Sequence, residues 1–318
     1  MTMNATRMLL RSLTATALVS LPLAFGSVVS FAQQDDGISS FAAAMEPPLF
    51  DTPSAAIEAF KASLAVDDFD GLAKLLGLDA AKLKAEESTK ETFEQIRQGA
   101  ARQVVVQDLG DRQLLQIGDR LWPLPFPIVK DDDGKWYFDT YAGLEEIINR
   151  RVGENELEAI STLRALVEAQ EEYSADDHDG DSVLEYAQKL ISSEGATDGL
   201  YWPPDQGDGE SLIGEFADQA ALGKARQGEG YFGYRFRVLT GQGDNVAGGR
   251  YDYVINGNMI AGFGLVAWPV KYGETGVHTF VVNRNGVVYE ADLGEETETI
   301  ATGIKRFNPD QNWDVVAD

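Results

Sequence analysis

The spacing of apolar residues in this chain changes twice from a helical period to an extended one, and this restricts the fold more than any other feature. In the first half, Thr52 and Pro53 form an N-cap and a first-turn proline, which predicts a helix at 53–66. Apolar spacing predicts further helices at 69–76 and 89–101. Short runs of strand-forming residues, separated by Gly and Asp, then predict a small antiparallel sheet. The runs are Val104–Val106, Leu114–Ile117 and Trp136–Phe138.

The second half repeats the order of helices and strands. Asn155 followed by Glu158 imitates a capping box. Together with Gly153, this pattern predicts that one helix ends near Arg151 and that a new one reaches about Tyr173. The other segments expected to be helical are 184–193 and 211–224.

Strands are predicted from residue 231 onward, where aromatic and β-branched residues alternate with Gly and Arg. Asn256-Gly257 and Asn285-Gly286 predict hairpin turns, because both residue types tolerate a positive φ. The strands that these turns join are expected near 250–255, 258–267, 277–283 and 287–291. The segment 228–233 matches a phosphate-binding glycine pattern, but a strand follows it instead of a helix, so we interpret it as a turn.

These patterns predict an α+β fold with two domains, each with helices packed on a small antiparallel sheet. The expected domains are residues 51–153 and 154–318. Residues 33–50 mix Gln, Asp, Ser and Pro and predict a flexible leader.

The N-terminus has the pattern of an export signal. Arg7 and Arg11 precede an uncharged apolar stretch, and Ser30 and Ala32 are the small residues that a signal peptidase requires. We therefore expect a cleavable signal peptide at 1–32, a periplasmic protein, and no membrane insertion after cleavage. The alternative is an uncleaved anchor, because residues 12–32 nearly reach the length of a bilayer span.

The composition excludes several classes of function. The chain has 52 acidic and 26 basic residues, a net charge of -26, which opposes binding to nucleic acid or to anionic lipid. It has no cysteine, so disulfides and thiolate chemistry are impossible, and its two histidines cannot form a three-His metal site. The expected partner is an envelope protein or a small ligand.

The segment 177–185 carries the clearest constellation of metal ligands. Acidic residues alternate as in a helix–loop–helix calcium loop, and Ca²⁺ prefers six to eight oxygen ligands. The candidate ligands are Asp177, Asp179, Asp181, Val183 through its carbonyl, and Glu185. Two departures predict weak affinity: Ser182 replaces a turn glycine, and Gln188 replaces a bidentate glutamate. The alternative is a solvated acidic loop that caps the next helix.

Several short segments of the sequence, in the same order, resemble the bacterial family called domain of unknown function 2950. They include Arg150–Leu157, Asp198–Trp202, Tyr251–Gly257 and Leu265–Pro269, and the resemblance runs from about residue 46 to the C-terminus. It implies an exported protein of Gram-negative bacteria with no assigned activity. The helix to Tyr173 and the strands around His278 also resemble the globular head of pilin-like proteins.

Nothing in the sequence forms a known catalytic motif around His278, which lies in a predicted strand. We therefore expect a non-enzymatic binding or structural module of the cell envelope, with a weak calcium site. The alternative is a periplasmic hydrolase that uses carboxylates or His278.

Overall fold

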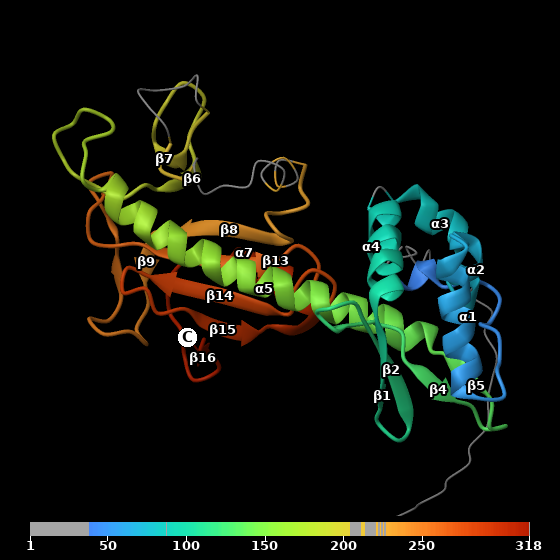
Figure 1. Ribbon diagram of the computed structural model, residues 1–318. Coiled ribbons are helices and arrows are strands. Elements are labelled where there is room, and N and C mark those ends of the chain that lie inside the picture. The colour runs from blue at the N-terminus through green and yellow to red at the C-terminus, as the bar shows by residue number, and fades with distance from the viewer. Residues whose placement is uncertain are drawn as a thin grey trace, which may run out of the picture. The chain divides into compact units, whose positions relative to one another are not determined.

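The computed structural model describes residues 38–317 except for residues 87, 204–210, 214–220, 222, 224 and 226 (Figure 1). The predicted signal peptide at 1–32 lies outside the described residues, and so does most of the predicted helix at 211–224. Within the described part, no helix combines the length and the apolar character needed to cross a bilayer.

The N-terminal half consists of helices followed by a small antiparallel sheet, as the sequence predicts. Thr52 caps the first helix, because its hydroxyl accepts a hydrogen bond from the backbone N–H of Ala55 at 3.2 Å. The strand order is β1-β2-β4-β5, and β3 pairs with β2. The helices are η1 Ile38–Phe41, α1 Pro53–Ala65, α2 Phe69–Leu75, α3 Ala80–Ala85 and α4 Thr89–Arg102. The strands are β1 Val104–Asp108, β2 Arg112–Ile117, β3 Trp122–Pro123, β4 Ile128–Lys130 and β5 Trp136–Phe138.

One hydrophobic core holds this half together. Phe60 of α1, Ile128 of β4 and Phe138 of β5 are fully buried in it. Residues 38–50, expected to be a flexible leader, contribute to the same core: Phe41 and Phe50 pack against it, and Phe50 pairs with β5. Two aromatic side chains therefore attach this segment to the core.

A single long helix, α5 Thr140–Tyr173, replaces the two helices that the sequence predicts. The predicted break at Gly153 is wrong, because residues 140–173 are continuous. One glycine costs only about 1 kcal/mol in a helix, and packing on both sides of it outweighs that cost. Leu144 of α5 belongs to the N-terminal core and Leu163 to the C-terminal one. The division of the chain into domains 51–153 and 154–318 stays a prediction.

The C-terminal half is built on a five-stranded antiparallel sheet with the order β16-β15-β14-β13-β8. Its strands are β8 Tyr234–Leu239, β13 Gly264–Pro269, β14 His278–Asn283, β15 Tyr289–Asp292 and β16 Asp314–Val315. The smaller strands are β6 Lys189–Ile191, β7 Gly199–Tyr201, β9 Gly241–Gln242, β10 Tyr251–Asp252, β11 Val254–Ile255 and β12 Asn258–Met259. The 3₁₀ helix η2 Gly294–Glu296 and the helix α7 Thr297–Gly303 precede β16.

Helices pack against both faces of this sheet, and Figure 1 shows α5 crossing one of them. On one face, Leu265 and Ala267 of β13 share a core with Leu163 of α5. On the other face, Val266 of β13 shares a core with Ala301 of α7. Every residue of β13 is therefore buried, which explains why this strand reads as a continuous apolar run.

The structure corrects three further predictions in this half. The helix predicted at 184–193 is wrong, because residues 184–188 have no regular structure and 189–191 form β6. Both strands predicted before residue 268 are divided: the one near 250–255 into β10 and β11, and the one near 258–267 into β12 and β13. The Asn256-Gly257 turn is confirmed between β11 and β12, with φ of 54° at Asn256 and 102° at Gly257.

Candidate metal centre and neighbouring groups

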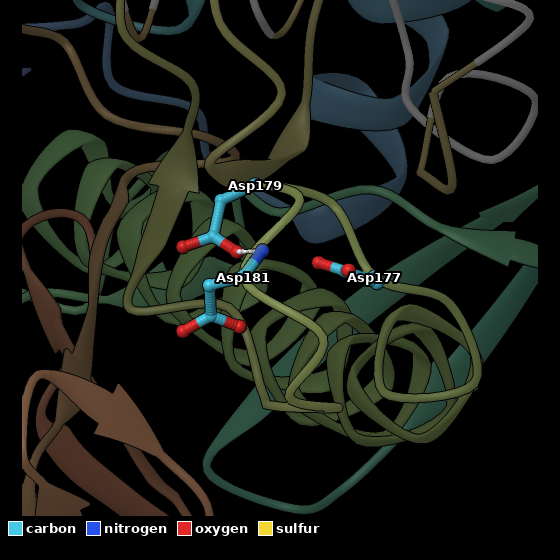
Figure 2. Close-up of side chains that lie close together, drawn as sticks. All are labelled: Asp177, Asp179 and Asp181. Atoms are coloured by element: carbon cyan, nitrogen blue, oxygen red, sulfur yellow. Dashed lines mark hydrogen bonds between the residues drawn. The ribbon is translucent and has the colours of Figure 1, made fainter.

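Three of the predicted metal ligands lie together. Asp177, Asp179 and Asp181 each offer a carboxylate oxygen, and these oxygens lie within 4.8 Å of one another (Figure 2). All three side chains are exposed, on the loop that follows α5. Three negative charges this close repel one another, and a divalent cation would relieve the repulsion.

The backbone of the loop folds around these carboxylates. Asp177 accepts hydrogen bonds from the N–H groups of Gly180 at 2.8 Å and Ser182 at 2.9 Å. These donors, Ser182 first, lower the pKa of the Asp177 carboxyl below its ordinary value, so this group is ionised at neutral pH. Ser182 has a φ of 69°, the left-handed conformation that favours glycine. The loop therefore makes the sharp turn at Ser182 without the expected glycine.

Glu185 is placed differently from the three aspartates. The Glu185 carboxylate accepts a hydrogen bond from the N–H of Met259 at 2.7 Å, so it is directed to β12 and does not belong to the aspartate group. The N–H of Val183 donates to Asp181 at 2.7 Å. Of the four predicted carboxylate ligands, Glu185 therefore lies outside the close group.

Contacts with the β11–β12 hairpin were not predictable from the acidic pattern. The Asn258 amide donates to Asp181 at 2.5 Å, and the Gln188 amide donates to the carbonyl of Gly257 at 2.6 Å. Gln188, expected at the last ligand position, is thus bonded to the hairpin. The Asn256-Gly257 motif predicted the hairpin, but no local signal indicated that it would meet this loop.

His278 lies beside the carboxylate of Glu156. Its Nδ1 is 3.2 Å from Glu156, whose same oxygen accepts the backbone N–H groups of Val277 at 2.8 Å and His278 at 2.9 Å. Burial, and then the Glu156 charge, raise the pKa of the Tyr234 phenol, which donates to the carbonyl of His278 at 2.9 Å. Among the described residues, no serine or threonine hydroxyl is hydrogen-bonded to His278. Glu156 thus joins α5 to the start of β14.

An open groove of about 600 Å³ lies between α5, β6, β7 and β8. Tyr231 and Phe236 line it from the sheet side, and Thr162 and Ala165 from α5. The predicted turn is confirmed there, because Phe232 and Gly233 have φ of 47° and 72° and Tyr231 pairs with Tyr234.

The fold and this loop define an α+β protein with a cluster of surface aspartates. The chain belongs to the family described as "Protein of unknown function (DUF2950)", whose model matches residues 48–316. This confirms the family resemblance seen in the sequence. No curated protein and no solved structure matches the chain, and the resemblance to a pilin head is not confirmed.

Proposed function

We propose that this protein is an exported, non-enzymatic binding module of the cell envelope and that its acidic loop binds Ca²⁺. The observation that carries the calcium proposal is the convergence of the Asp177, Asp179 and Asp181 carboxylates within 4.8 Å. Hard carboxylate oxygens on a tight loop are the ligands that Ca²⁺ prefers.

The expected affinity is weak. Glu185 and Gln188 are both bonded to the β11–β12 hairpin, so water has to complete the coordination. Sites with few protein ligands resemble those of extracellular modules, with Kd on the order of 10⁻⁴ to 10⁻³ M. A periplasmic protein that meets millimolar Ca²⁺ would still be partly occupied.

Thermal unfolding with and without Ca²⁺ at fixed ionic strength tests this site. Ca²⁺ at a hundred times Kd should stabilise the native state by about 2.7 kcal/mol and raise Tm. Mg²⁺ should do less, because it gives up its water reluctantly and demands stricter geometry. Asp179→Asn removes one charge of the cluster but keeps an oxygen for the N–H of Asp181, and it should abolish the increase.

Asp176→Asn is the matched control, because Asp176 is exposed on the same loop and lies outside the aspartate group. This variant should respond to Ca²⁺ like the wild type. A wild-type melting curve that Ca²⁺ leaves unchanged would contradict the site. So would an equal loss of the Ca²⁺-induced increase in Tm in both variants, and the loop would then be a solvated turn.

Export rests on the signal pattern around Arg7 and Ala32. Mass spectrometry of the periplasmic fraction should find a mature protein that begins at Gln33. A full-length product in the membrane pellet would contradict this part of the proposal.

The alternative of a hydrolase depends on His278 and Glu156. Two backbone N–H groups already bind the carboxylate of Glu156, which favours a structural role for the pair. Hydrolysis of ester or peptide substrates by the wild type, abolished in a folded His278→Gln variant, would support the alternative instead.

A further inference from the structure

A cavity of about 400 Å³ that is open to solvent lies in the N-terminal half between α2, α3, α4 and the first turns of α5. Among the described residues, its lining is apolar except for four. Those four, Glu86, Ser88, Thr89 and Thr92, lie together at the start of α4. The cavity therefore has an apolar interior and one polar edge.

The packing of α4 against its neighbours explains why side chains do not fill this cavity. At its C-terminal end, α4 touches β2 closely: a Cβ on Gly99 would lie 2.8 Å from the Ile117 side chain. A Cβ on Gly118 would lie 3.4 Å from the Cα of Gly99. Toward its N-terminal end, by contrast, Phe93 and Ile96 face the core but are only half-buried. No side chain of α4 is buried, so this helix leaves its apolar side incompletely covered.

The interior of the cavity suits a hydrocarbon chain. Leu72, Leu124 and Phe126 line it and are almost completely buried. An enclosed apolar cavity of about 150 Å³ accepts benzene. At the same volume per carbon atom as benzene in that cavity, 400 Å³ accommodates a chain of about sixteen carbons.

The polar edge selects the head group. Among the described lining residues, Glu86 is the only charged one, and the chain as a whole carries a net charge of -26. These charges oppose a purely anionic head and favour one that includes a cation. The hydroxyl of Ser88 makes no hydrogen bond to the first turn of α4, so it can donate to a phosphate oxygen.

We propose that this cavity binds the acyl chain of a single-chain zwitterionic amphiphile of the lysophospholipid type, with its head group at the start of α4. Glu86 would pair with the ammonium group, and Ser88 and Thr89 would donate to the phosphate. This site is separate from the acidic loop, so it does not depend on calcium.

Calorimetric titration of the full chain with 1-acyl lysophosphatidylethanolamine, below its critical micelle concentration, tests the proposal. We expect saturable binding at one site. Affinity should increase about fourfold for each added methylene until the chain reaches about sixteen carbons, because each buried CH₂ contributes a constant increment. Absence of saturable binding, or an affinity independent of chain length, would overturn the proposal.

Variants that fill the cavity with a larger side chain test whether the ligand binds there. Ile96→Trp and Leu83→Trp place a large ring in it from α4 and α3, at positions that are only half-buried. Each should weaken binding by about tenfold or more. Lys90→Trp adds the same ring to an exposed position of α4 outside the lining and should bind like the wild type. Unchanged binding in whichever filled variant remains folded, or an equal loss in Lys90→Trp, would overturn the location.

The head group is tested separately with palmitate, which has the chain but only a negative head. Wild-type protein should bind palmitate more weakly than the C16 lysophospholipid, and Glu86→Gln should reduce that difference. Equal binding of the two ligands by the wild type would overturn the zwitterionic head group.

Discussion

The side chain of Gln170 forms two hydrogen bonds with the backbone of Ala187, both at 2.8 Å. Its amide donates to the Ala187 carbonyl, and its carbonyl oxygen accepts the Ala187 N–H. Gln170 is fully buried on α5, and Ala187 follows the acidic loop. The pair therefore satisfies the backbone of a chain segment that has no regular structure.

Replacing Gln170 by methionine should be strongly destabilising. Methionine fills a similar volume but leaves the buried N–H and C=O of Ala187 without partners, at a cost of about 2 to 5 kcal/mol in the free energy of unfolding. Urea denaturation measures this change. Glu172→Met, at an exposed position of the same helix, should change stability by less than about 0.5 kcal/mol. Similar values for both variants would show that the Gln170 contacts contribute little.

Alanine substitutions at two glycines of α5 should change stability in opposite directions. A Cβ on Gly143 would lie 2.0 Å from the Phe126 ring, whereas nothing lies within 4 Å of a Cβ on Gly153. We expect Gly143→Ala to destabilise by about 1 to 3 kcal/mol. Gly153→Ala should stabilise by about 0.5 to 1 kcal/mol, because it improves the propensity of an uninterrupted helix. A destabilised Gly153→Ala variant would indicate that α5 does bend or break there.

Asp198 should make stability depend on pH. Burial raises the pKa of its carboxyl, but hydrogen bonds from Lys189 at 2.5 Å and Ser193 at 2.7 Å outweigh burial, and the net pKa is lowered. A carboxyl with a lowered folded-state pKa stabilises the protein above its unfolded pKa, and this contribution is lost as pH falls through the folded value. The free energy of unfolding of Asp198→Asn should therefore be about 0.5 to 1 kcal/mol lower than that of the wild type at pH 7. This difference should shrink below about pH 4.

Chemical denaturation of both proteins between pH 3 and pH 7 checks this dependence. Glu194→Gln is the control, because Glu194 is an exposed neighbour on the same connection. A difference between Asp198→Asn and wild type that stays constant over this range would exclude the carboxylate as its source.

Residues 154–318 should fold on their own. The first residue of α5 in the C-terminal core is Ala159, so the fragment keeps that whole core. It also keeps Asn155, whose amide donates to the carbonyl of Thr275 at 2.9 Å. A cooperative thermal transition of the purified fragment is the expected result, and a broad transition without a baseline would contradict the predicted domain boundary.

Features fixed by neighbouring residues were predictable from the sequence. Thr52 and Pro53 indicate the start of α1, and Asn256-Gly257 indicates the β11–β12 turn. The three aspartates of the loop come together because they alternate within five residues. In each case the interacting groups are close in the chain, so a short pattern contains the necessary information.

Features fixed by distant residues were not predictable. The segment 184–193 has helical spacing, but Gln170 and Met259 bind its backbone and hold it in an extended form. Glu185 was expected to face the aspartates, yet its partner Met259 lies 74 residues away. The continuity of α5 through Gly153 likewise depends on packing at both of its ends. Local sequence patterns do not contain information about these long-range contacts.

The complete burial of β13 determines which unfolding event exposes its amide protons to solvent. Its amide protons are covered by β8 and β14 at its edges and by helices on both faces. Fraying of an outer strand does not expose them, so the amides of Val266 and Ala267 exchange with deuterium only when the whole half unfolds. The exchange rate of this one strand therefore measures the global stability of the C-terminal half under native conditions.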